Sequence, residues 1–426
     1  MIKKPFLLAA MFLILLAACN KAEQPVEPTA TPLSDYLDAP ALMANENGLD
    51  LVFQGGGAKG LAHIGAIKSL EEQGRSYRRL VGTSAGSIVA VLLAAGYSAD
   101  EMEAVIAERM PDGNIIMGSF LVPPEKDEFS EEQLRNSVTY RSFQDILPEF
   151  VPDFASEELD LDAVKLLLDS PEYRGLFSLL EEGGLYSGSG FVAWLAEQLD
   201  RDGRDLGEAT LAEFHQATGA DLTIVATDTN HGAMLMLNHR TAPDLPVVWA
   251  VRMSTSIPFV FQEVEWLSEW GTYQGQDISG HLIVDGGTAT NLPLGLVLSQ
   301  DAEIIAAMEK QPAPERVIGL VLDHQKMLPG LEATPTPRAI VDIDALENQR
   351  IEERWQQIEE RTLNLVDTLL NAHDNLLAAT YPEHVCKLPV GGVETLEYDM
   401  SDEKIDKLMA AAGAEMRTCL TRLERR

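Results

Sequence analysis

Two strand–turn–helix units that follow one another early in this 426-residue chain constrain its fold more than any other feature. The first runs from the apolar segment 49–53 through a glycine-rich turn into a helical pattern over residues 61–73. The second runs from another apolar segment through a turn around Ser84 into an apolar helix over residues 87–95. Successive units of this type predict parallel strands joined by right-handed crossovers, so we expect an α/β fold.

The second turn has the pattern of a nucleophile turn. Its residues Gly82-Thr83-Ser84-Ala85-Gly86 place a serine between two glycines, which lets the backbone fold sharply without Cβ clashes. The serine hydroxyl is then held at a strand-to-helix turn, where the helix N-terminus stabilises negative charge. Ser84 is therefore a candidate nucleophile, and the alternative is an ordinary structural turn before a helix.

The first turn, Gly55-Gly56-Gly57-Ala58-Lys59-Gly60, exposes successive backbone N–H groups at a helix N-terminus, an arrangement that binds anions. It is not a Walker loop, because Leu61 follows Gly60 where that motif requires Lys and then Ser or Thr. Both turns should lie at the carboxyl edge of one sheet. The loop N–H groups could then face the oxygen that gains charge when Ser84 attacks a carbonyl. The alternative is two helix caps that meet no ligand.

Four blocks of this sequence resemble those of patatin-like phospholipases. The blocks are Gly55–Gly60, Gly82–Gly86, Trp249–Phe259 (WAVRMSTSIPF) and Asp285-Gly286-Gly287. The resemblance covers residues 49–298, and it does not extend to the segment 111–182 or to the C-terminal third. It implies a three-layer α/β/α patatin-like fold with a mainly parallel central sheet, to which we add a C-terminal helical extension.

The resemblance also implies a site. Ser84 would be the nucleophile and Asp285 its base in a dyad that needs no histidine, and the carboxylate would need burial to raise its proton affinity. The oxyanion would be held by the backbone N–H groups of Gly56, Gly57 and Ala58. The residues that support these motifs are Gly55, Lys59, Gly60, Gly82, Gly86, Gly286 and Gly287. We expect no cofactor and no metal ion, because the chain has no calcium-loop pattern and no Cys/His cluster with zinc spacing.

The function expected from this site is a serine acyl hydrolase, phospholipase-like or lysophospholipase-like, that cleaves lipid esters through an acyl-enzyme. Two alternatives stay open. In one, His324 completes a Ser84–Asp285–His324 triad of the α/β-hydrolase order, which makes the protein an esterase. In the other, the chain keeps the fold as a non-catalytic lipid-binding lipoprotein of the cell envelope.

The N-terminus is interpreted as a lipoprotein signal peptide over residues 1–18. Lys3 and Lys4 precede an apolar run over residues 6–18 that is too short to span a bilayer comfortably. The run ends in Leu16-Ala17-Ala18-Cys19, which resembles the lipobox of bacterial lipoproteins, so Cys19 is the expected lipidation site. The alternative is a plain secretory signal with an incidental cysteine.

The next segment, residues 19–48, is rich in proline and is expected to be a flexible tether. A lipid anchor followed by a tether predicts a protein of the bacterial cell envelope at a membrane surface. Asn20, which stands where an aspartate would resemble an inner-membrane retention signal, favours the outer membrane. The formal net charge of −35 argues against a nucleic-acid partner. The expected partners are a phospholipid or other acyl-ester substrate and the membrane, and no protein partner is indicated.

The remaining boundaries follow from composition and periodicity. We expect a hydrolase domain over residues 49–330, with an acidic insertion at 111–182 that carries helices near 130–138 and 159–168. The insertion is either a lid over the site or a peripheral decoration.

A C-terminal helical region over residues 331–426 should contain helices at 340–380 and 401–423. Cys386 and Cys419 in this region either pair in an oxidising compartment or remain two buried thiols.

Overall fold

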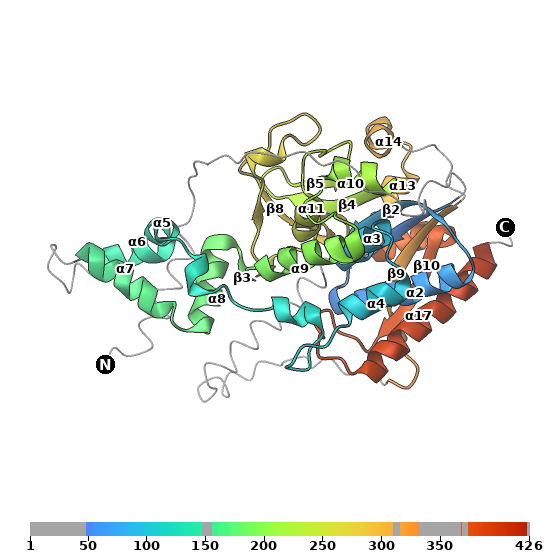
Figure 1. Ribbon diagram of the computed structural model, residues 1–426, viewed down its shortest axis with the longest axis horizontal. Helices are drawn as coiled ribbons and strands as arrows, with labels where there is room; N and C mark the ends of the chain where they lie inside the picture. Colours follow the sequence, from blue (N-terminus) through green and yellow to red (C-terminus); the bar gives the residue numbers. More distant parts are fainter. Residues whose placement is uncertain (1–47, 147–155, 310–315, 332–367, 369–373, 424–426) are drawn as a thin grey trace. The chain divides into compact units, whose positions relative to one another are not determined.

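The computed structural model describes residues 48–146, 156–309, 316–331, 368 and 374–423 (Figure 1). The predicted signal peptide, the lipidation site Cys19 and all but the last residue of the tether lie outside these residues, as does most of the helix expected over 340–380. The described residues divide into two compact units. The smaller consists of Phe120–Gly190 and Pro258–Glu263, and the larger contains the rest.

The larger unit is built on a mainly parallel sheet. The strands follow the order β10-β9-β1-β2-β4-β8-β7, and β5 pairs with β4. The pairs from β10 to β4 are parallel, whereas β5 and β8 run antiparallel to β4, and β7 runs antiparallel to β8. The strands are β1 (Leu49–Phe53), β2 (Tyr77–Thr83), β4 (Asp221–Asp228), β5 (Ala233–Leu237), β7 (Val264–Glu265), β8 (Leu282–Asp285), β9 (Val317–Met327) and β10 (Val385–Gly391). This confirms the expected fold class.

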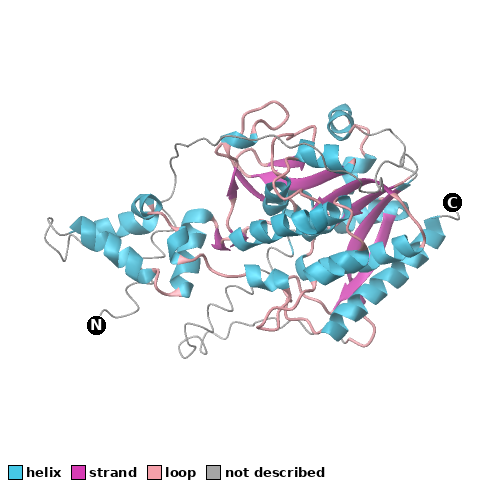
Figure 2. Ribbon diagram, viewed as in Figure 1, coloured by secondary structure: helices cyan, strands magenta, loops and turns pink. Residues whose placement is uncertain are grey.

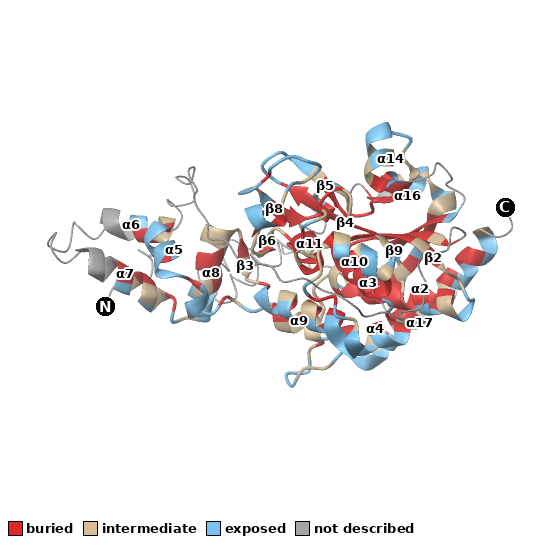
Figure 3. Ribbon diagram, turned by 45° about the horizontal axis from the view of Figure 1, so that its top comes forward, coloured by how far each residue is buried: buried red, intermediate tan, exposed pale blue. Residues whose placement is uncertain are grey.

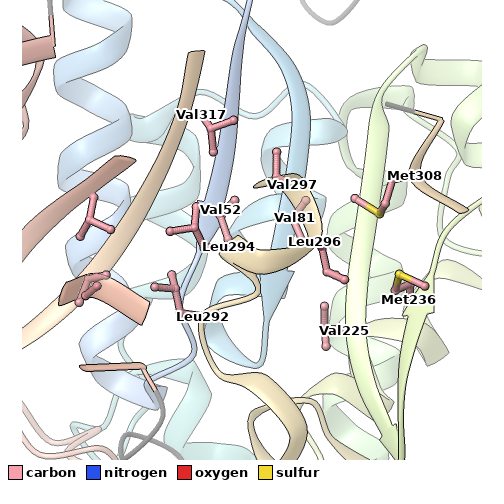
Figure 4. Packing of buried hydrophobic residues seen from close by; sticks show 13 residues of the cluster. Val52, Val81, Val225, Met236, Leu292, Leu294, Leu296, Val297, Met308 and Val317 are labelled. Carbon is pink, nitrogen blue, oxygen red and sulfur yellow. The ribbon is translucent and has the colours of Figure 1, made fainter. Parts of the chain in front are cut away.

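Helices cover both faces of this sheet. On one face, Val52, Val81 and Val225 from three neighbouring strands pack against helix α13 (Leu294–Leu298) (Figure 4). Side chains alternate along a strand, so Phe53 lies on the other face, where its backbone touches Gly86 of helix α3 (Ala85–Ala94). Helices α2 (Leu61–Glu72) and α17 (Asp402–Leu423) pack together beside α3, and the strands between the layers are buried (Figure 3).

The smaller unit has its own apolar core and a two-stranded parallel sheet of β3 (Gly184–Tyr186) and β6 (Phe259–Phe261). Its helices are α5 (Glu131–Asn136), α6 (Val138–Ile146), α7 (Ser156–Leu167) and α8 (Pro171–Glu182). Ser130 caps α5 by accepting the N–H of Gln133 at 3.2 Å. The helices predicted near 130–138 and 159–168 are therefore present, while the lid interpretation stays a prediction.

The C-terminal region contains a strand that the sequence analysis did not predict. Helix α17 confirms the expected helix at 401–423, but β10 adds a parallel strand to the sheet edge beside β9 (Figure 2). Pro389 lies in β10, where the pairing with β9 is irregular between Pro389 and Gly391, and an edge strand with such an irregularity tolerates a proline. Within the described parts of the chain, no helix is both long and apolar enough to cross a membrane.

Cys386 on β10 and Cys419 on α17 form a disulfide, with Cα atoms 5.8 Å apart. The two cysteines therefore pair, and the alternative of two buried thiols is wrong. The bond joins the edge strand to the helix that packs on α2, so the two C-terminal elements are linked to each other covalently and to the rest of the unit by packing.

Replacing both cysteines by alanine is expected to lower the free energy of unfolding by about 2–4 kcal/mol, because the bond limits the entropy of the unfolded chain. Urea denaturation of the two proteins, with and without reductant, measures this loss. Reductant should lower the midpoint of the wild-type protein to that of the variant and leave the variant unchanged. A wild-type midpoint that does not respond to reductant contradicts the prediction.

Candidate active site

Ser84 lies at the junction of β2 and α3 in a strained backbone conformation. Its φ of 51° and ψ of −126° are unusual for a residue with a side chain, and such a conformation costs about 1–3 kcal/mol. Only glycine fits on either side of Ser84, because neighbouring backbone atoms lie too close for a Cβ. A Cβ on Gly82 would meet the carbonyl oxygen of Gly86 at 2.4 Å, and one on Gly86 would meet that of Phe53 at the same distance.

Hydrogen bonds from neighbouring serines fix this turn. The N–H of Ser84 donates to Oγ of Ser254 at 2.9 Å, and that hydroxyl donates to the carbonyl of Val225 at 2.6 Å. Ser87 Oγ donates to the carbonyl of Ser84 at 2.6 Å. Because Ser254 ends α11 (Val247–Ser254), the block Trp249–Phe259 directly supports the nucleophile turn. The resemblance of this block to the family predicted no role for Ser254.

The same block also supports Asp285. Ser256 accepts the N–H of Asp285 on its carbonyl at 2.8 Å. The fully buried Arg252 donates from Nη1 to the Ser256 hydroxyl, and burial lowers the pKa of Arg252 to about 10. Arg252 therefore positions the segment that holds Asp285.

Asp285 is the last residue of β8 and is fully buried. The register of the sheet brings it to Ser84, because Thr83 pairs with Val225 on β4 and the next residue, Ala226, pairs with Asp285. Ser84 and Asp285 thus flank β4 at the same level. Gly286 permits the turn that follows, since a Cβ there would meet the carbonyl oxygen of Val225 at 2.2 Å.

The carboxyl group of Asp285 has one satisfied oxygen and one unsatisfied oxygen. Oδ1 accepts the N–H of Gly287 at 2.7 Å, and Oδ2 has no hydrogen-bond partner of normal geometry among the residues that the structure describes. Burial raises the pKa of Asp285 to about 7, although hydrogen bonding from Ser84 and from Gly287 opposes the rise. An aspartate with this pKa can act as a base near neutral pH.

This pKa has a consequence for stability that the variant Asp285→Asn should reveal. Between the ordinary aspartate pKa of 3.8 and about 7, the unfolded chain ionises Asp285 while the native state keeps it protonated. The wild-type protein therefore loses stability as the pH rises through this window, and above it the loss is constant. The melting temperature of Asp285→Asn should exceed that of the wild type by an amount that grows from pH 4 to pH 7. A difference that is independent of pH contradicts the raised pKa.

His324 does not complete a triad. It is exposed on β9, and β1, β2 and β4 separate β9 from β8 in the sheet. Four strand spacings correspond to about 19 Å. The structure therefore brings Ser84 and Asp285 together without His324, and the triad alternative is wrong.

The glycine loop lies against the nucleophile turn. A Cβ on Gly55 would meet Cβ of Ser84 at 3.0 Å. The carbonyl of Asn291 accepts the N–H of Gly55 at 3.0 Å, and the side chain of Asn291 donates to the Gly55 carbonyl at 3.2 Å. Within the described chain, the N–H groups of Gly56 and Gly57 have no hydrogen-bond partner. They remain the candidates for binding an oxyanion.

The prediction for Ala58 is corrected. Its N–H donates to the carbonyl of Thr395 at 2.8 Å and is not available for an oxyanion. Lys59 also contacts Thr395, donating from Nζ to Oγ1 at 2.8 Å. Gly57 has a φ of 57°, and a Cβ at this position would lie only 2.1 Å from the Thr395 carbonyl oxygen. Thr395 follows β10, so the C-terminal region fixes the loop. Thr395 and Asn291 were not predicted from the sequence, because both lie outside the blocks that resemble the family.

Comparison with known proteins supports this architecture. The family model for patatin-like phospholipases matches residues 51–298. The chain is 30% identical to an uncharacterised protein, YqhO, of Bacillus subtilis over 254 residues, which are 58% of this chain and 66% of YqhO. It is 34% identical to a cUMP-AMP-activated phospholipase of Escherichia coli over 86 residues, or 18% of this chain and 27% of that protein. The chain thus spans less than two thirds of these relatives.

Among solved structures, the chain is similar to VipD from Legionella pneumophila, with a TM-score of 0.44 and 16% identity over 88% of this chain and 67% of VipD. The match of the family model extends over more than half of the 426 residues and includes Ser84, Asp285 and the glycine loop. The chain belongs to the patatin-like phospholipase family.

Proposed function

We propose that this protein is a serine acyl hydrolase that cleaves lipid esters through a Ser84–Asp285 dyad. One observation carries the proposal. A serine on a strained turn faces a fully buried aspartate whose pKa is about 7 and whose Oδ2 has no other partner in the described structure. Neither the strain nor the buried carboxyl group stabilises the fold, and both suit a nucleophile and its base.

The mechanism follows from these groups. Asp285, when ionised, accepts the proton of the Ser84 hydroxyl while Oγ attacks the ester carbonyl carbon. The N–H groups of Gly56 and Gly57 stabilise the oxyanion, and each such donor contributes about 3–4 kcal/mol in comparable enzymes. The intermediate collapses to acyl-Ser84 as the alcohol leaves with a proton from Asp285. Water, deprotonated by Asp285, then attacks the acyl carbon, and the bond to Ser84 breaks as Asp285 returns the proton to the Ser84 oxygen and the fatty acid is released.

The proposed substrates are phospholipids, lysophospholipids or other acyl esters. Membership of the family supports this class, and one of the relatives is named a phospholipase. Nothing in the chemistry of the dyad requires a metal ion, because an aspartate and two N–H groups supply the base and the oxyanion contacts.

Incubation of the full chain with mixed phospholipids, lysophospholipids, triacylglycerols and a short-chain chromogenic ester tests the activity and ranks the substrates. A fluorophosphonate probe tests the nucleophile in parallel. The proposal expects release of fatty acid from at least one lipid class and stoichiometric labelling of Ser84. Absence of both in a folded protein would instead support the lipid-binding lipoprotein.

We also propose that Cys19 is lipidated and that the protein is attached to the cell envelope, most simply at the outer membrane. The lipobox-like sequence Leu16–Cys19 supports this proposal. Mass spectrometry of the mature N-terminus should find a diacylglyceryl group on Cys19. The variant Cys19→Ala should leave the membrane fraction. A mature protein that begins at another residue, without lipid, contradicts the proposal.

Ser254 offers a test of how the nucleophile turn is held. The variant Ser254→Ala leaves the buried N–H of Ser84 without its acceptor, which costs about 1–3 kcal/mol. We expect kcat for a soluble ester to fall about tenfold. Thr255→Ala is the matched control, because in the described part of the chain its hydroxyl donates to the carbonyls of Val251 and Arg252 within its own helix turn. Equal kcat values for the two variants would show that Ser254 does not position Ser84.

A further inference from the structure

A second group of chemically active side chains lies away from the dyad, where β4 ends and β8 begins. Asp228 is the last residue of β4, His231 follows it in a turn, and His281 directly precedes β8. Oδ2 of Asp228 lies 2.8 Å from Nδ1 of His281 and 3.2 Å from Nδ1 of His231. One ligand atom from each of the three residues lies within 4.8 Å of the other two.

The carboxylate at the centre of this group is held in a fixed orientation. Asp228 is 1% exposed, and its Oδ1 accepts the backbone N–H groups of Asn230 at 2.9 Å and His231 at 3.2 Å. These contacts leave Oδ2 directed at the two imidazole rings. A metal site benefits from this, because a ligand that is already oriented loses little freedom on binding.

The backbone around the group is also fixed. The N–H of Thr229 donates to the carbonyl of Leu282 at 3.0 Å, and the N–H of Leu282 donates to Oδ1 of Asn230 at 2.8 Å. The turn after β4 is therefore tied to the first residue of β8. Both histidines are positioned by strand ends.

We propose that Asp228, His231 and His281 form a binding site for a divalent transition-metal ion of the zinc class. Tetrahedral Zn²⁺ with bonds of about 2.0–2.1 Å places its ligand atoms about 3.4 Å apart. The two oxygen–nitrogen distances of 2.8 and 3.2 Å need only a small expansion to reach this value. Two imidazoles and one carboxylate suit zinc, nickel or copper, whereas calcium and magnesium prefer oxygen ligands alone.

The exposure of the ligands indicates how such an ion would reach the site. The side chain of Asp228 is 2% exposed, that of His281 20% and that of His231 59%. The buried carboxylate is therefore reached from solvent past the half-exposed His231. No metal ion was expected from the sequence, which has no calcium-loop pattern and no Cys/His cluster with zinc spacing, and His281 lies 53 residues after Asp228.

The alternative is that the histidines are only hydrogen-bond partners of a buried carboxylate. One imidazole would satisfy Oδ2, since Oδ1 already accepts two N–H groups. The second imidazole, from the exposed His231, converges on the same oxygen and makes an edge contact with the first ring at a centroid distance of 4.5 Å. Two imidazoles and one carboxylate whose ligand atoms all lie within 4.8 Å of one another favour the metal site.

Metal binding by the full chain, prepared without a histidine tag and treated with chelator, tests the proposal independently of any hydrolase activity. Co²⁺ is the probe, because its visible absorption reports coordination geometry, and Zn²⁺ competes for the same site. We expect saturable binding of one Co²⁺ per chain with the intense bands of a four- or five-coordinate ion. Zn²⁺ should displace it and should raise the melting temperature.

Three variants and one control define the ligands. His231→Ala removes an exposed side chain, and each of His231→Ala, His281→Ala and Asp228→Asn should weaken Co²⁺ affinity at least about tenfold. His239→Ala is the control and should bind like the wild type, because His239 stacks on His215 at a centroid distance of 3.5 Å and belongs to no such cluster among the described residues.

Two results would overturn the proposal. One is the absence of saturable Co²⁺ or Zn²⁺ binding to the wild-type protein, which would leave the cluster as a hydrogen-bonded pair of histidines. The other is unchanged affinity in His231→Ala, which decides the matter even where His281→Ala or Asp228→Asn fails to fold. Melting curves without metal identify any variant that has lost its structure.

Discussion

The variant Ser84→Ala is expected to lose turnover by at least about 10⁴-fold, because the acyl-enzyme cannot form without the serine oxygen. The loss should appear equally with a soluble ester and with phospholipid vesicles, since both reactions use the same nucleophile. The substitution should leave the turn intact, because the hydrogen bond from Ser84 to Ser254 comes from the backbone N–H and does not involve the side chain. Ser84 is buried, and alanine is small enough to fit in its place. Steady-state kinetics with a folded variant measure the effect.

Labelling separates a lost nucleophile from a damaged protein. Ser84→Ala should not react with a fluorophosphonate, whereas Ser98→Ala should react like the wild type. Ser98 caps helix α4 (Ala99–Ile106) and lies away from the nucleophile turn in the chain, so its loss affects a helix end. If Ser84→Ala keeps activity within tenfold of the wild type, another residue is the nucleophile and the proposed mechanism fails.

The variant Asp285→Asn is expected to lower kcat by about 10³-fold. An asparagine keeps an oxygen for the N–H of Gly287 and fits the same buried space, but it cannot accept the proton of Ser84. Because the change preserves shape, the substrate should bind with little change in affinity. A loss confined to kcat therefore identifies Asp285 as a base.

The pH dependence of the wild-type enzyme should report the same group. Ionised Asp285 is the active form, so kcat/KM should rise with pH and level off above an apparent pKa near 7. In Asp285→Asn the residual rate should lack this inflection. A wild-type profile that is flat between pH 5 and pH 9, or a variant that retains the inflection, would assign the titration to another residue.

The sequence predicted the central part of the fold because that part is encoded locally. Glycines around Ser84 and in the first loop indicate sharp turns before helices, and two such units require parallel strands. Asp285 was predicted as the base of Ser84 from the resemblance of its short block to the family. These signals depend on residues close together in the chain.

The rest of the site depends on contacts that no local pattern records. Thr395 lies 336 residues after Lys59 in the chain and contacts the glycine loop. Its carbonyl accepts the N–H of Ala58, which was expected to bind an oxyanion. The strand β10 carries a proline and gave no strand signal. His324 satisfied the chain order of a triad, and only the order of the strands shows that it is too far away.

The attachment of the glycine loop to Thr395 determines when the site can be completed during synthesis. A growing chain that ends before β10 already contains Ser84, Asp285 and the whole of the matched domain, yet it lacks the carbonyl that holds Ala58 and the hydroxyl that holds Lys59. The glycine loop gains these two hydrogen bonds only after Thr395 has been made and β10 has joined the sheet beside β9. The loop beside Ser84 therefore takes its final hydrogen bonds from a segment that is synthesised after the matched domain and lies outside it.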